Sequence, residues 1–114
     1  MSYRLRVAKK YVVEYANMEA FNGKIAEFHE LLGALDMDYT GEIYDQSFEV
    51  YKESYLCGIN KLKSFNELSQ FEQQNIYDII KSLGKYTVEE IIAILEKYLE
   101  ASDPDWDWLE FAFF

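Results

Sequence analysis

The chain has 114 residues, of which half are hydrophobic, and a formal net charge of −10 at pH 7. This length and apolar content indicate a single compact domain spanning residues 1–114 and exclude an intrinsically disordered chain. The excess of carboxylates argues against direct nucleic-acid binding, which requires clustered lysine and arginine. No segment is long and apolar enough to predict a membrane span, so we expect no membrane association.

The chain has one cysteine, Cys57, which therefore has no partner for an intrachain disulfide. No signal-peptide pattern precedes the first predicted element. Free thiols persist in reducing compartments, so we expect a cytoplasmic protein.

Residues 3–15 predict β-structure, because apolar and charged side chains alternate and β-branched and aromatic residues are frequent. Lys9-Lys10 marks a candidate turn that would divide this strand in two. A helix is predicted next, from about Lys24 to Leu35, with an apolar face at helical spacing. That face consists of Ile25, Phe28, Leu31, Leu32 and Leu35.

Three more helices are predicted in the second half of the chain. The segment from Tyr44 to Leu62 has a stripe at 3.6-residue spacing, which favours one long helix. The stripe consists of Tyr44, Phe48, Tyr51, Tyr55, Ile59 and Leu62. Ser69 and Glu72 form a capping-box pattern that starts a third helix, ending near Gly84. Thr87 and Glu90 repeat the pattern and start a fourth helix.

Asp103-Pro104-Asp105 ends the fourth helix, and the aromatic segment 106–114 that follows is too apolar to be left exposed. We predict that this segment forms a strand paired with residues 3–15. The expected fold class is therefore α+β, with about four helices packed on a small antiparallel sheet formed by the N-terminal and C-terminal segments.

Oxygen-bearing side chains alternate after the first predicted helix, in the order Asp36-Met37-Asp38-Tyr39-Thr40-Gly41-Glu42-Ile43. With the helix ahead of it, this order resembles the first two-thirds of an EF-hand calcium site. The resemblance implies Asp36, Asp38 and Thr40 as candidate metal ligands. Ser47 stands where the EF-hand has its closing bidentate glutamate, so we expect calcium to bind weakly or not at all. We accordingly predict no metal site and no cofactor.

A row of carboxylates is predicted on the Tyr44 to Leu62 helix, where Asp45, Glu49 and Glu53 are spaced four apart and Glu42 lies just ahead. On a helix they would be about 6 Å apart and would repel one another by a few tenths of a kcal/mol per pair. The structural interpretation is a solvated helix face. The functional interpretation is a phosphate-like surface. In size, charge and aromatic content the chain is similar to small acidic inhibitors from mobile elements that mimic nucleic acid.

Aromatic residues are numerous, with ten tyrosines, eight phenylalanines and two tryptophans. Tyrosine is favoured at protein interfaces, so some of these rings are expected to be contact residues. The candidates are Tyr39, Tyr44, Tyr86 and Tyr98. His29 has no cysteine, serine or second histidine at helical spacing, and we interpret it as a boundary residue of its helix.

The sequence contains no glycine-rich phosphate loop, GxSxG or CxxC pattern, and we expect a protein that is not an enzyme. Our hypothesis is an acidic interaction domain that binds a basic protein surface, in its sharpest form an inhibitor or nucleic-acid mimic of phage or mobile-element type. The expected partner-binding residues are Glu42, Asp45, Glu49, Glu53 and Tyr39. A homo-oligomeric structural or accessory domain is the first alternative, and a degenerate EF-hand-like calcium-responsive domain is the second.

Overall fold

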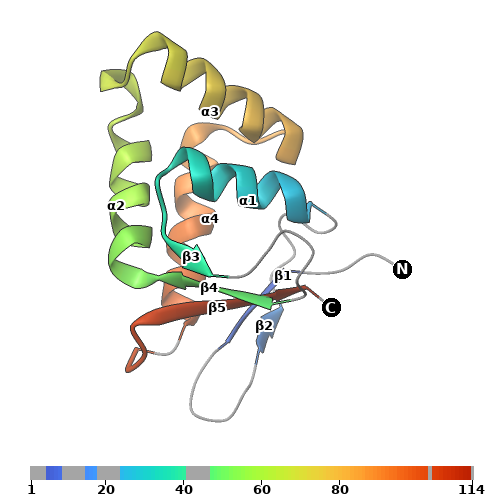
Figure 1. Ribbon diagram of the computed structural model, residues 1–114. Coiled ribbons are helices and arrows are strands. Elements are labelled where there is room, and N and C mark those ends of the chain that lie inside the picture. Colours follow the sequence, from blue (N-terminus) through green and yellow to red (C-terminus); the bar gives the residue numbers. More distant parts are fainter. Residues whose placement is uncertain (1–4, 9–14, 18–23, 41–46, 103, 114) are drawn as a thin grey trace.

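The computed structural model describes residues 5–8, 15–17, 24–40, 47–102 and 104–113, arranged as Figure 1 shows. Helices and strands are interleaved along the chain, and the last element is a strand. In chain order they are β1 (Leu5–Ala8), β2 (Tyr15–Asn17), α1 (Ile25–Ala34), β3 (Tyr39–Thr40), β4 (Ser47–Tyr51), α2 (Lys52–Lys63), the 3-10 helix η1 (Phe65–Glu67), α3 (Gln70–Leu83), α4 (Val88–Ala101) and β5 (Trp108–Phe113).

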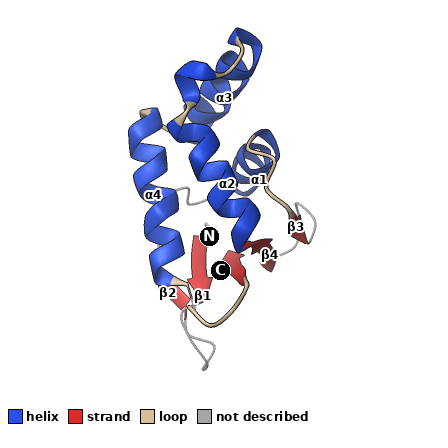
Figure 2. Ribbon diagram, turned by 90° about the vertical axis from the view of Figure 1, so that its left-hand side faces the viewer, coloured by secondary structure: helices blue, strands red, loops and turns tan. Residues whose placement is uncertain are grey.

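The strands of the described residues form one antiparallel sheet in the order β2-β1-β5-β4-β3. The α-helices lie on one side of this sheet (Figures 1 and 2). Strand β1 pairs with β5, with Val7 opposite Phe111, so the predicted pairing of the N-terminal and C-terminal segments is confirmed. The predicted α+β class is also confirmed, and the sheet is extended by β3 and β4. The candidate turn at Lys9-Lys10 lies outside the described residues.

The predicted single helix from Tyr44 to Leu62 is wrong over Ser47–Tyr51, which form β4, and right from Lys52 onward. Strand β4 is paired with β5 along its whole length, from Ser47 opposite Ala112 to Tyr51 opposite Trp108. This pairing satisfies backbone groups that a helix would satisfy internally. Phenylalanine, valine and tyrosine prefer strands to helices, so the local preference favours β4 once β5 supplies a partner.

The two helix starts predicted from capping boxes are confirmed. The Ser69 hydroxyl accepts a hydrogen bond from the Glu72 backbone N–H at 3.2 Å, and α3 ends with Gly84 as its C-cap. At the start of α4 both halves of the capping box are present, joining Thr87 and Glu90. Each cap satisfies a backbone donor that the first helical turn leaves unpaired, which fixes where each helix begins.

The core is centred on the Phe111 ring of β5, which is fully buried. Rings from α1, α2, α4 and β4 surround it. Their centroids lie 5.4 Å (Phe28), 6.2 Å (Tyr55), 5.9 Å (Tyr98) and 5.3 Å (Phe48) from that of Phe111. The cluster therefore joins the sheet to three helices that are far apart in the sequence.

Two tyrosines are wholly inside this core. The Tyr55 hydroxyl donates a hydrogen bond to the Leu95 carbonyl oxygen at 2.6 Å, which satisfies a buried polar group. Burial raises the pKa of the Tyr55 phenol and that of Tyr98 well above the ordinary range. The expectation that Tyr98 is an exposed contact residue is wrong, since it is 1% exposed and closes the core beneath Phe28 and Phe111.

Helix α2 passes very close to the segment that follows α1, and Gly58 makes this approach possible. A methyl group at Gly58 would lie 2.8 Å from Met37 Cγ and 3.2 Å from Leu35 Cβ. Both neighbours are buried core residues, so neither can move into solvent without exposing apolar surface.

We predict that Gly58→Ala lowers the free energy of unfolding by about 1 kcal/mol. Alanine gains about 1 kcal/mol of helix preference, but overpacking a tight core costs roughly 1–3 kcal/mol. The matched control is Gly33→Ala in α1, where a methyl group would have nothing within 4 Å. This control variant should raise the free energy of unfolding by roughly 0.5–1 kcal/mol. Urea denaturation measures both, and equal stabilisation by the two variants would contradict the tight approach.

Candidate functional site

The predicted calcium loop begins as the end of a helix. The Asp36 N–H donates to the Gly33 carbonyl at 3.1 Å, and the Met37 N–H donates to the Leu32 carbonyl at 3.0 Å. With Asp36 at a φ of 57°, these two bonds form a Schellman motif. Asp36 is therefore the left-handed residue that terminates α1, a position that aspartate tolerates better than most residues.

The Asp36 carboxylate is already bound to a cation of the protein. Lys61 Nζ lies 2.9 Å from Asp36 Oδ2, 3.1 Å from Glu72 Oε2 and 3.0 Å from the Ala34 carbonyl oxygen. An ammonium group has three donors, and each has an acceptor here. Lys61 thus ties α2 to α3 and to the carbonyl end of α1, where a positive charge also favours the helix dipole.

The rest of the EF-hand resemblance does not extend to the fold. Thr40 lies in β3 opposite Glu49, and Ser47 begins strand β4 at the point where an EF-hand would begin its exiting helix. Gly41 to Gln46 lie outside the described residues. Within the described part of the chain, no three side chains of the types that ligate metals converge on one point. Weak or absent calcium binding stays a prediction, to be checked by titration calorimetry.

We predict that Lys61→Met lowers the free energy of unfolding by about 1–2 kcal/mol, because it leaves three acceptors without their charged donor. Lys63→Met is the matched control on the same helix. Lys63 is 51% exposed and 3.6 Å from Glu96, so its loss should cost no more than about 0.5 kcal/mol. Equal costs in chemical denaturation would contradict the structural role of Lys61.

Burial lowers the pKa of Lys61, but the hydrogen bonds and charges of Asp36 and Glu72 outweigh this and leave the pKa raised. A raised pKa in the folded state gives stability that is complete below the unfolded pKa, near 10.4, and is lost as pH rises through the folded value. Above about pH 10, wild type should therefore lose stability faster than Lys61→Met. The measurement is the difference in free energy of unfolding between wild type and Lys61→Met as pH rises. Buried Tyr55 and Tyr98 lower the stability of both proteins at alkaline pH, and the difference removes their contribution.

The predicted carboxylate row is not one helix face. Glu49 lies in β4 and Glu53 in the first turn of α2, while Glu42 and Asp45 lie outside the described residues. In that turn an acidic side chain also stabilises the helix through its dipole. The prediction of a carboxylate row is wrong because it assumed a helix through residues 47–51. These residues form a strand, in which side chains alternate between two faces.

Alternation along β4 and β5 separates two faces of the sheet. Phe48, Val50, Leu109 and Phe111 are buried against the helices. Glu49, Tyr51, Trp108 and Glu110 occupy the alternate positions and are partly exposed. Across the ladder Glu49 lies directly opposite Glu110, and Tyr51 directly opposite Trp108. The described helices all lie on the other side of the sheet (Figure 2).

Two further carboxylates gather at the Tyr51 end of this ladder. The Tyr51 and Trp108 rings make an edge-to-face contact with centroids 5.2 Å apart, and the Tyr51 hydroxyl donates to Glu53 Oε2 at 3.4 Å. The negative charge of Glu53 raises the pKa of Tyr51, and desolvation, the hydrogen bond and the charge of Asp107 add to the effect. We call these six residues the acidic-aromatic face: Glu49, Tyr51, Glu53, Asp107, Trp108 and Glu110.

The structure thus brings together Glu49 and Glu53 from the predicted set, on either side of Tyr51. Sequence reasoning missed Trp108, Glu110 and Asp107, and it placed Tyr51 on the buried stripe. One signal could have found two of them. Within the C-terminal strand, Trp108 and Glu110 alternate with the apolar Leu109 and Phe111, which is the pattern of a strand with one solvated face.

Tyr39 lies away from this face. In the β3–β4 ladder Tyr39 is opposite buried Val50, so it belongs to the inner side of the sheet, where it is 36% exposed at the edge. The centroid of its ring lies 5.0 Å from that of His29, and the Phe48 centroid lies 4.5 Å from that of His29. His29 is 2% exposed, so its interpretation as a boundary residue is wrong. Rings of β3 and β4 contact His29 and contribute to its burial.

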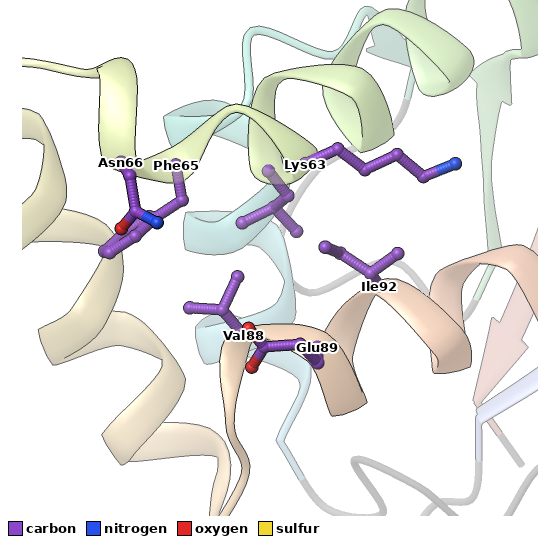
Figure 3. Close-up of a pocket in the computed structure, with 7 residues that line it drawn as sticks. Lys63, Phe65, Asn66, Val88, Glu89 and Ile92 are labelled. Atoms are coloured by element: carbon purple, nitrogen blue, oxygen red, sulfur yellow. The ribbon is translucent and has the colours of Figure 1, made fainter.

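A hollow of about 350 Å³ lies between the end of α2, η1 and the start of α4 (Figure 3). Its apolar lining comes from Leu62, Phe65, Val88 and Ile92, and its polar lining from Lys63, Asn66 and Glu89. Lys63 extends away from the centre of the hollow and pairs with Glu96. One lysine, one glutamate and one amide are too few groups to assign a reaction.

None of the described helices combines the length and the apolar character that crossing a bilayer requires. Comparisons with protein families, with curated proteins and with solved structures find no match for this chain. Function is therefore inferred from the geometry of the acidic-aromatic face.

We predict that Glu49→Lys raises the free energy of unfolding by roughly 0.2–1 kcal/mol, because it replaces a like-charge cross-strand pair with an opposite-charge pair. Glu67→Lys on η1 is the matched control. It makes the same change in net charge at an exposed position, and so reports the general relief of self-repulsion. Thermal denaturation of both variants is the measurement. A gain no larger than that of Glu67→Lys would contradict the specific repulsion.

Proposed function

We propose that this protein is a small, acidic, non-enzymatic interaction domain that binds a basic protein surface through its acidic-aromatic face. The observation that carries the proposal is the register of β4 and β5, which sets Glu49 against Glu110 on the partly exposed side of the sheet. The same register places Tyr51 and Trp108 beside these carboxylates, and Glu53 and Asp107 lie at the Tyr51 end. A cationic partner would be attracted to this concentration of negative charge.

The aromatic residues of the face support the same proposal. Tyrosine and tryptophan are enriched in protein interfaces, because their rings add contact area with little loss of rotamer entropy. Trp106, two residues before Trp108 in the sequence, is also exposed, at 55%. A surface of carboxylates alone would be expected to remain solvated. Carboxylates around partly exposed rings favour a protein contact that combines charge attraction with burial of apolar area.

The net charge of −10 limits the class of partner. It disfavours nucleic acid, whose phosphates would be repelled, and it would steer a basic protein toward the domain over a Debye length of about 10 Å. The nucleic-acid-mimic form of the proposal depended on a regular carboxylate row along one helix. Because Glu49 and Glu53 lie on different elements, we propose a basic protein partner without that mimicry.

The test is capture of binding proteins from a lysate of the producing cells, with a charge-reversed face. The variant carries Glu49→Lys, Glu53→Lys and Asp107→Lys. Its matched control carries Glu67→Lys, Glu89→Lys and Glu100→Lys, which change the net charge equally at exposed positions of η1 and α4. A specific partner should be captured by wild type and by the control, and lost with the face variant.

Affinity for the purified partner should then fall by at least about ten-fold, or about 1.4 kcal/mol, in the face variant. It should also fall as salt screens the exposed charges. Equal loss with both triple variants would reduce the interaction to nonspecific attraction, and undiminished capture by the face variant would contradict the proposal. Circular dichroism is the check that each variant is folded.

Self-association is the second candidate function, and exposed rings elsewhere on the surface favour it. Phe71 on α3 is 83% exposed and Tyr77 on the same helix is 46% exposed. Apolar contacts are nearly indifferent to salt, so this candidate expects a mass that rises with protein concentration at low and high salt alike. Light scattering distinguishes the two candidates.

A further inference from the structure

We infer that the acidic-aromatic face selects arginine, so that its partner is an arginine-rich segment rather than a lysine-rich one. This inference rests on the proposed function and names the side chain that the face recognises. Arginine and lysine carry the same charge but differ in shape. The guanidinium group is planar, weakly hydrated and able to stack on rings, whereas the ammonium group is a compact, strongly hydrated point charge.

The first element of the face is a pair of rings. Tyr51 and Trp108 lie opposite each other in the ladder, with ring planes inclined at 61° and centroids 5.2 Å apart. In this arrangement the edge of one ring contacts the other ring, and the pair remains partly exposed. A planar cation can lie over the exposed part of a ring, within about 6 Å of its centroid.

The second element is carboxylates beside those rings. Glu53 accepts the hydrogen bond of the Tyr51 hydroxyl at 3.4 Å, and Glu49 precedes Tyr51 by two residues on the same side of β4. Same-side neighbours in a strand are about 6.6 Å apart. A guanidinium group stacked on Tyr51 would therefore have carboxylate oxygens within reach at its edge. Paired N–H to carboxylate bonds in the plane of the group are available to arginine and not to lysine.

The third element is the repetition of this composition just before β5. Trp106 and Trp108 alternate with Asp105 and Asp107, and Trp106 is 55% exposed. The chain has two tryptophans, and both are in this segment. Rings and carboxylates thus alternate along the sequence that leads into β5. A lysine-rich segment would gain from the carboxylates but much less from the rings, since its ammonium groups keep their hydration.

The test compares oligo-arginine with oligo-lysine peptides of equal length, at about physiological ionic strength. We expect the arginine peptide to bind at least about five-fold more tightly, which is about 1 kcal/mol. Binding is measured by titration calorimetry and by the change in intrinsic fluorescence. Because Trp108 lies at the face, arginine binding should alter the tryptophan emission.

Variants separate the rings from the carboxylates. Trp108→Leu, which keeps an apolar residue in β5, should lower the arginine-to-lysine affinity ratio, because it removes one ring of the Tyr51–Trp108 pair. Trp106→Leu should lower the ratio partly, and at 55% exposure it tests the rings even if Trp108→Leu fails to fold. Glu49→Gln should weaken both peptides without abolishing the preference. Tyr77→Leu, which removes an exposed ring on α3, should change neither affinity.

Equal affinities of the two peptides in wild type would overturn the arginine preference. If the two peptides bound wild type equally and neither bound the charge-reversed face variant, the proposed function would stand without the arginine preference. Failure of both peptides to bind would overturn the inference and weaken the proposed function together. A preference for arginine that survives in both tryptophan variants and in Tyr51→Leu would also overturn the inference, because the rings would then have no part in it.

Discussion

Phe111 lies at the centre of the sheet, and aromatic rings from α1, α2, α4 and β4 contact it with centroid distances of 5.3 to 6.2 Å. Each such pair contributes roughly 0.5–1.5 kcal/mol beyond the burial of its area. Strand β5, which carries Phe111, is also the central strand, paired with β1 on one side and β4 on the other. The last element of the chain therefore holds the earlier elements together.

The same strand fixes the acidic-aromatic face. A shift of one residue in a strand moves every side chain to the opposite face. Burial of Leu109 and Phe111 excludes that shift, because it would expose two fully buried side chains and bury a carboxylate. Trp108 and Glu110 are consequently held on the outer side opposite Tyr51 and Glu49. The core thus determines which side chains the outer side of the sheet presents.

Lysines of α2 have a structural role at the opposite end of the helix from that face. Lys61 binds Asp36 and Glu72, and Lys63 lies 3.6 Å from Glu96. Both lysines are in the last turn of α2, where a positive charge favours the helix dipole. The first turn of the same helix carries Glu53 beside Tyr51. At its C-terminal end, α2 therefore neutralises carboxylates of other elements. At its N-terminal end it contributes the Glu53 carboxylate to the proposed binding face.

Local signals in the sequence determined the features that depend on residues close together along the chain. The capping pairs Ser69–Glu72 and Thr87–Glu90 predict where α3 and α4 begin, because each involves hydrogen bonds across three residues. The apolar character of the C-terminal segment predicted that it is a strand paired with the N-terminal one, since burial was the alternative to an exposed aromatic patch. These observations together predicted that the fold belongs to the α+β class.

The tertiary structure decided what depends on partners distant in sequence. The sequence pattern of residues 47–51 is compatible with a helical stripe and with a strand. These residues form strand β4 because β5 supplies a pairing partner. Asp36 fits a calcium ligand by its spacing, but the Schellman motif and Lys61, from another helix, give it a structural role. Glu49 and Glu110 are each ordinary acidic residues in the sequence. They become a face because a strand pairing, which periodicity along one segment cannot reveal, sets them opposite each other.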